Sequence, residues 1–226
     1  MGKKLQVAIA IFDKMVMLDA IGPYEILQPI PTIDVVFVSH KPGLVSDRMG
    51  YLSIYATHSF EDVPKPDIVI VPGGTGIIKL LNDQTFISWL QKAHETTLYT
   101  TSVCTGALML GSAGLLKGLK ATTHWSILAD LAKYGAIPSE SRVVQEGKII
   151  TSAGVSSGMD MALHLASLIT DETMAKTLQL YVEYDPQPPF DVGSLAKAGP
   201  ELEKKARALM AALRQEAAER QEAAKS

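Results

Sequence analysis

A single cysteine occurs in the chain, and its neighbours are typical of a reactive thiol. Cys104 lies where an apolar strand-like segment gives way to small residues, in Thr101-Ser102-Val103-Cys104-Thr105-Gly106-Ala107. A strand–turn–helix of this kind lifts a nucleophile to the edge of a sheet. The start of the following helix would favour the thiolate over the thiol. A buried, inert cysteine is the alternative interpretation, but this context favours Cys104 as a nucleophile.

A carboxylate lies within an apolar stretch near the N-terminus. Asp19 is flanked by Met15-Val16-Met17-Leu18 and by Ala20-Ile21-Gly22-Pro23. Burial in such a stretch would raise the pKa of the carboxyl group, so that it holds a proton near neutral pH as a general acid must. Asp19 would alternatively cap a helix that begins near Pro23. The two interpretations are compatible, and we predict an acid–base role.

A glycine-rich loop follows another apolar segment, in Val71-Pro72-Gly73-Gly74-Thr75-Gly76. Neither the dinucleotide fingerprint G-x-G-x-x-G nor the phosphate-loop G-K-[ST] is present in it. Ligands of α/β proteins bind at the carboxyl ends of strands. The backbone N–H groups of Gly73 and Gly74 would therefore suit an anion or an oxyanion. A plain tight turn is the alternative.

The five histidines form no H-x-x-H or H-E-x-x-H pattern, so we expect no metal site. One of them, His124, precedes Trp125 and ends a short strand-like segment, Ala121-Thr122-Thr123. Its position predicts that His124 and Trp125 line the same crevice as the cysteine.

These residues need a scaffold, and the rest of the chain predicts a layered α/β fold. Short β-branched runs indicate buried parallel strands, and segments with helical spacing separate them. Two further runs flank Glu146-Gly147 and predict a hairpin. The predicted strands are Leu5–Ile11, Asp34–Val38, Asp67–Val71, Leu98–Ser102, Arg142–Gln145 and Lys148–Thr151; the predicted helices are Tyr24–Pro29, Ile77–His94, Gly106–Leu116, Ser156–Ile169 and Glu172–Glu183.

The C-terminal part has a different composition. Asp185–Pro200 is rich in proline and glycine, and residues 201–226 are rich in Ala, Glu, Lys and Arg, which predicts a long helix. We expect a catalytic domain over residues 1–195 and a helical tail over 196–226.

The composition of the chain argues against several classes of function. The 226 residues carry a net charge of −3, so nucleic acid is not the expected partner. One cysteine excludes an intramolecular disulfide framework and a cysteine-rich metal site. The apolar runs are shorter than the roughly 18 residues of a membrane span, and no secretory signal is evident. We expect a cytoplasmic protein that acts on a small molecule.

Together these motifs resemble the PfpI-like superfamily, and within it the bacterial isonitrile hydratases. The resemblance covers about residues 5–195, and it is carried by five segments: Asp19–Tyr24, Val71–Gly76, Thr101–Gly106, Ala121–Trp125 and Glu183–Gly193. It implies a flavodoxin-like sandwich, a mostly parallel sheet with helices on both faces, and a nucleophile elbow. It also implies a homodimer.

The resemblance implies a specific chemistry. Cys104 would add to the terminal carbon of an isonitrile, Asp19 would transfer protons, and Thr105 would orient the sulfur. The product would be an N-substituted formamide, formed through a thioimidate and without an organic cofactor or metal. Proteases of the superfamily have histidine directly after the cysteine, where this chain has Thr105, which argues against proteolysis. A lyase acting on reactive carbonyls, like a glyoxalase or deglycase, and a redox sensor stay open as alternatives.

Overall fold

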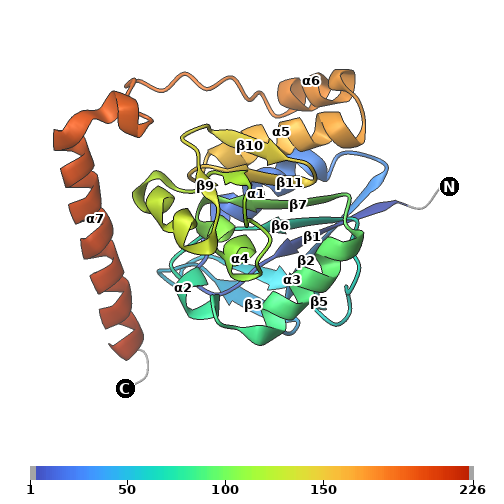
Figure 1. Ribbon diagram of the computed structural model, residues 1–226, viewed down its shortest axis with the longest axis horizontal. Helices are drawn as coiled ribbons and strands as arrows, with labels where there is room; N and C mark the ends of the chain where they lie inside the picture. Colours follow the sequence, from blue (N-terminus) through green and yellow to red (C-terminus); the bar gives the residue numbers. More distant parts are fainter. Residues whose placement is uncertain (1–3, 224–226) are drawn as a thin grey trace. The chain divides into compact units, whose positions relative to one another are not determined.

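The computed structural model describes the backbone of residues 4–223, with the side chains up to residue 217 and at 219 (Figure 1). Two compact units divide between Tyr184 and Asp185. The first contains the whole of the predicted α/β arrangement.

Seven strands form the central sheet of the first unit. Their spatial order is β10-β11-β7-β6-β1-β2-β5, and every pair is parallel except the hairpin β10–β11. The sequence-based strands and hairpin are confirmed, each within one residue at either end; β5 was not predicted. The bounds are β1 Leu5–Ala10, β2 Ile33–Ser39, β5 His58–Ser59, β6 Ile68–Val71, β7 Tyr99–Val103, β10 Val143–Glu146 and β11 Ile149–Ser152.

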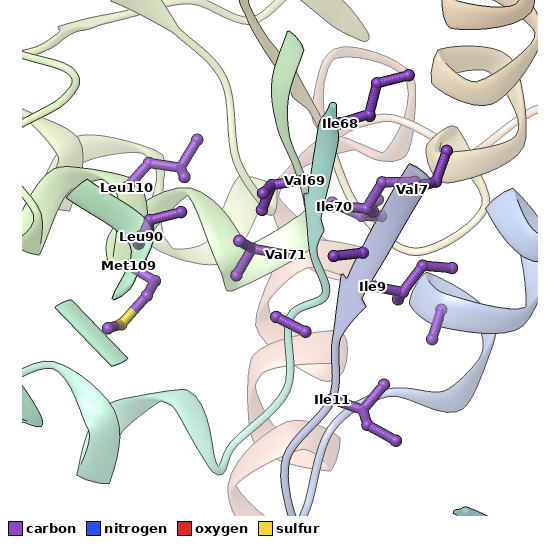
Figure 2. Packing of buried hydrophobic residues seen from close by; sticks show 14 of the residues in the cluster. Val7, Ile9, Ile11, Ile68, Val69, Ile70, Val71, Leu90, Met109 and Leu110 are labelled. Carbon is purple, nitrogen blue, oxygen red and sulfur yellow. The ribbon is translucent and has the colours of Figure 1, made fainter. Parts of the chain in front are cut away.

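Helices cover both faces of this sheet, because the central strands are apolar on both sides. All four residues of β6 are completely buried. In Figure 2, Val69 and Val71 point toward residues of α3 (Gln84–Thr96) and α4 (Ala107–Ser112), whereas Ile68 and Ile70 point the opposite way. Near-continuous apolar runs are what a doubly covered parallel sheet requires. The predicted flavodoxin-like α/β fold is therefore confirmed.

Three predicted helices differ by more than two residues from those observed; the third, predicted over Gly106–Leu116, is α4 and ends at Ser112. The first, α1, spans Met17–Leu27, so Pro23 lies inside the helix rather than at its first position. The predicted helix Ile77–His94 is split into α2 (Ile77–Leu80) and α3, because the Asp83 side chain accepts the Phe86 N–H and starts a new helix. Asp19 consequently belongs to the first turn of α1, and the residue at the cap position is Val16.

The remaining helices of the first unit pack near the C-terminal strands. A 3₁₀ turn, η1 (Cys104–Gly106), leads into α4, and η2 (Trp125–Tyr134) ends at a left-handed Gly135. Helix α5 (Ser157–Ile169) packs against α1 and α6 (Glu172–Tyr181). Close approach is possible there because Gly158 faces Val103 and Pro23. Two small sheets complete this unit: β3 (Gly43–Ser46) with β4 (Ser53–Ala56), and β8 (Lys120–Ala121) with β9 (Ile137–Pro138).

The second unit contains α7 (Leu195–Ala223), which starts six residues before the predicted helix. Its helical conformation is interrupted at Gly199, which has a φ of 70°. Residues 224–226 of the predicted helix lie outside the described part of the chain. Among the described helices, none has the length and hydrophobicity that crossing a bilayer requires.

Candidate active site

Cys104 lies on a strained turn between β7 and η1. Its φ is 56°, a region that residues with a side chain rarely adopt. The backbone is held on both sides: the Cys104 N–H donates to the Ala153 carbonyl (2.9 Å), and Thr123 Oγ1 donates to the Cys104 carbonyl (2.7 Å). The strand–turn–helix predicted from the sequence is present, and it leaves Cys104 only 3% exposed.

Asp19 lies beside this thiol and is completely buried. Its Oδ2 accepts the backbone N–H of Gly73 at 2.9 Å, whereas its Oδ1 is buried without a hydrogen-bond partner among the described residues, and the Cys104 side chain is near enough to lower the pKa of the carboxyl group. Burial raises the pKa of Asp19 to about 7, although the hydrogen bonds from Gly73 and Cys104 act in the opposite direction. The structure therefore places a carboxyl group that can hold a proton at neutral pH in contact with the only cysteine.

The thiol itself is not activated at rest. Burial and the neighbouring Asp19 charge raise the pKa of Cys104 to about 12, while hydrogen bonds from the backbone N–H groups of Val155 and Thr105 lower it. The expectation that the helix terminus favours the thiolate is wrong for this state. Burial is the largest cause of the raised pKa, since the sulfur is almost completely removed from water.

Cys104 is therefore a thiol at rest, not a preformed thiolate, and Asp19 beside it can accept or donate a proton. At neutral pH the sulfur keeps its proton, and the raised pKa of Asp19 allows its carboxyl group to hold one as well. Any attack by sulfur must be coupled to the transfer of its proton. Asp19 is in contact with the thiol and its pKa lies near the working pH, which is the condition for efficient general acid–base catalysis.

The glycine-rich loop positions this pair. Gly73 binds the Asp19 carboxylate, while the Gly74 N–H donates to Thr105 Oγ1 at 2.7 Å, and Thr105 Oγ1 donates to the Gly74 carbonyl at 3.2 Å. Both N–H groups are engaged by side chains. The two N–H groups therefore position Asp19 and Thr105, and they are not free to bind an oxyanion as the sequence predicted. Thr105 contacts the sulfur through its backbone N–H.

A side chain at position 73 would not fit. A Cβ built there would lie 2.4 Å from the Thr105 nitrogen and 2.9 Å from Cys104 Cβ. Only glycine therefore allows the loop to approach the cysteine turn this closely.

His124 lies beside the β11–α5 connection, which follows the strand next to β7. His124 Nδ1 accepts the Ser126 N–H (3.2 Å), which caps η2, and the His124 ring packs on Gly154. Trp125 lies against the His124 ring, with 5.4 Å between the ring centroids. His124 therefore supports the segment next to the cysteine.

The segment Ala153–Val155 also belongs to the site and was not predicted from the sequence. Ala153 accepts the Cys104 N–H, and Val155 donates its own N–H to the sulfur. Val155 has a φ of 27°, which is rare for a β-branched residue. The only sequence signal for Val155 was its place just after β11, the strand that pairs with β7. Its apolar side chain gave no sign of a role in the site.

The described part of the chain was also compared with the side-chain arrangements that hold metal ions. Within the described residues, no group of three or more His, Cys, Asp or Glu side chains is arranged to hold a metal ion.

The fold and the cysteine turn agree with the comparison against known families. The chain matches the DJ-1/PfpI family over residues 5–168, and it belongs to that family.

Individual relatives give a finer comparison. The chain is 40% identical over 190 residues to isonitrile hydratase from Pseudomonas putida, covering 84% of this chain and 83% of that protein. It is similar to the crystal structure of a ThiJ/PfpI family protein from Pseudomonas syringae, with a TM-score of 0.88 and 35% identity over 96% of this chain and 90% of that chain. A deglycase from Pyrococcus abyssi is 25% identical over 150 residues, which cover 66% of this chain and 89% of that protein.

Proposed function

We propose that the protein hydrates isonitriles to N-substituted formamides, with Cys104 as nucleophile and Asp19 as the proton-transfer group. The observation that carries the proposal is the direct contact between a buried carboxyl group of pKa about 7 and the only thiol. Support also comes from the 40% identity to the hydratase of Pseudomonas putida.

In the first half of the reaction, Cys104 Sγ forms a bond to the terminal carbon of R–N≡C. Protonated Asp19 gives its proton to that carbon and takes up the thiol proton. The product of this half is the thioimidate R–N=CH–S–Cys104, in which all atoms of the thiol and the isonitrile are retained. Covalent attachment divides one difficult hydration into two easier additions.

In the second half, water adds to the thioimidate carbon and a proton reaches the nitrogen. Asp19 takes part as base toward the water and as acid toward the nitrogen, which its pKa permits. The tetrahedral R–NH–CH(OH)–S–Cys104 then collapses: the C–S bond breaks, the sulfur regains a proton through Asp19, and R–NH–CHO leaves. The thiol is regenerated, and the net change is addition of one water.

Action on reactive carbonyl compounds is the second candidate, favoured by the similarity to the deglycase. One experiment separates the candidates: purified protein is incubated with cyclohexyl isonitrile in ¹⁸O-water, and separately with methylglyoxal. We expect the formamide to carry ¹⁸O and methylglyoxal to be unchanged. Turnover of methylglyoxal alone would reject the hydratase, and inertness to both with sulfinate formation under peroxide would indicate a redox sensor.

Asp19→Asn tests the proton-transfer role within the same assay. A positioned acid–base group contributes about 10²–10⁴-fold, so the amide should lower kcat by that factor. A decrease of only a few fold would mean that Asp19 merely holds Gly73.

We further propose that the protein acts as a homodimer, as the resemblance implies. Light scattering of the full chain should give twice its mass of 24.3 kDa.

A further inference from the structure

A charged cluster outside the catalytic pair lies at the start of α5. The Arg142 side chain donates one hydrogen bond to the Asp160 carboxylate and another to Ser156 Oγ (3.2 Å). Tyr184 lies against the same two charges: burial and the Asp160 carboxylate raise the pKa of Tyr184, and a hydrogen bond with Arg142 lowers it. The proposed reaction uses none of these four side chains.

Arg142 is also joined to the cysteine turn through the main chain. Its carbonyl accepts the Ala153 N–H (2.9 Å), and the Ala153 carbonyl in turn accepts the Cys104 N–H (2.9 Å). The guanidinium of the same residue reaches Ser156. Arg142 therefore holds both ends of the four-residue segment 153–156, its main chain at one end and its side chain at the other.

Val155 lies in the middle of that segment. Its φ of 27° is a conformation that persists only where the surrounding structure enforces it. Its N–H group is one of two backbone donors, with that of Thr105, that lower the pKa of the thiol against the effect of burial. A displacement of Val155 would remove one of these two hydrogen bonds and would raise the pKa of the thiol further.

We propose that Arg142 is a positioning residue, which holds segment 153–156 so that the Val155 N–H stays directed at Cys104 Sγ. Its guanidinium can bind Asp160 and Ser156 at once because its donors form a planar fork, whereas a lysine ammonium has no such fork. The consequence for turnover rests on the proposed function; the consequence for the thiol does not.

The test compares Arg142→Ala and Arg142→Lys with wild type. Two quantities are measured: the rate of Cys104 alkylation by iodoacetamide as a function of pH, and kcat and KM for cyclohexyl isonitrile. Loss of one hydrogen bond to the sulfur should slow alkylation at fixed pH by about three- to tenfold in both variants. We expect kcat to fall by a similar factor with KM unchanged, since the contacts of Arg142 with Asp160 and Ser156 do not involve the substrate.

The matched control is Lys176→Ala, which removes an exposed ion pair with Glu172 on α6 and should leave both measurements unchanged. Wild-type behaviour of Arg142→Lys beside an impaired Arg142→Ala would overturn the proposal, because charge alone would then suffice. Unchanged alkylation in both variants would overturn it as well.

Should Arg142→Ala fail to fold, Ser156→Ala removes one of the two side-chain contacts and keeps the ion pair. A decrease in the alkylation rate that is smaller than the one expected for Arg142→Ala supports the positioning role of Arg142, and an unchanged rate contradicts it. Because alkylation needs no isonitrile, a wrong substrate assignment would affect kcat alone and leave this test intact.

Discussion

At the scale of single residues, the conformation of Cys104 has a measurable cost. A residue with a Cβ in the left-handed region is strained by about 1–2 kcal/mol, and glycine is not. In helices and strands, glycine is instead less stable than alanine by about 0.5–1 kcal/mol. The φ of 56° at Cys104 should reverse that order.

We therefore predict that Cys104→Gly is more stable than Cys104→Ala by about 1 kcal/mol, while neither variant hydrates isonitriles. Denaturant unfolding of the two variants measures the difference, and product analysis measures the activity. Since the chain has no other thiol, appreciable turnover by either variant would exclude the covalent route. The usual order, with alanine more stable, would mean that the turn relaxes without its sulfur.

The raised pKa of Asp19 also predicts how the free energy of unfolding depends on pH. The pKa of its carboxyl group is about 7 in the folded chain against 3.8 as the ordinary value. Between these values the unfolded chain ionises and the folded chain keeps the proton, so the free energy of unfolding decreases as pH rises through this window. The difference corresponds to about 4 kcal/mol, fully lost above pH 7.

The comparison that isolates this effect is wild type against Asp19→Asn at pH 4, 5.5 and 8. The stability of the variant relative to wild type should increase with pH by up to about 4 kcal/mol, because asparagine has no proton to lose. A pH-independent difference between the two proteins would show that the carboxyl group is ionised in the fold throughout.

At the scale of elements, the glycine loop limits what the site tolerates. Gly73→Ala would bring a methyl group against the Thr105 backbone and Cys104 Cβ, and backbone cannot give way cheaply. We expect a loss of about 1–3 kcal/mol in stability, together with loss of activity as the Asp19–Cys104 contact opens. Gly193→Ala is the control, since a Cβ there meets nothing within 4 Å. Equal effects in both variants would contradict the tight approach.

The strands of the central sheet could be predicted from the sequence, whereas the start of the first helix could not. Strands were predictable because buried parallel strands consist of uninterrupted β-branched residues, as in Ile68–Val71. The start of α1 was not, because Pro23 is a frequent first helical residue and here lies inside the helix. The contact between α1 and α5, in which Gly158 lies beside Pro23, involves residues far apart in the chain and leaves no local sign in the sequence.

Within the site, the predictable part consisted of side chains. Cys104 and Asp19 were found because a lone thiol on an elbow and a carboxylate in an apolar run are chemically conspicuous. Val155 was not, because its contribution is a backbone N–H that every residue except proline has. The state of the thiol was mispredicted for a related reason: desolvation depends on the depth of burial, which a motif does not specify.

At the scale of the whole molecule, we predict that a chain truncated after Tyr184 folds and keeps its thiol chemistry. Every residue of the proposed site lies in the first unit, and the family match ends at residue 168. The truncated chain should hydrate cyclohexyl isonitrile with kcat within about twofold of the full chain, since no catalytic group is removed. Circular dichroism and light scattering are the accompanying measurements. A folded but inactive chain would assign the second unit a part in the functional assembly.

The order of the central sheet has a further consequence, for self-association through unpaired strands. One edge is β5, which has only two residues, and the other is the antiparallel β10, which carries Gln145 and Glu146. Short edges and charged residues on edges are devices that prevent another chain from extending a sheet. The buried inner strands β1, β6 and β7 lie between these edges and are paired on both sides. The native protein therefore offers amyloid-like pairing little backbone to begin on, and aggregation would have to start from an opened sheet.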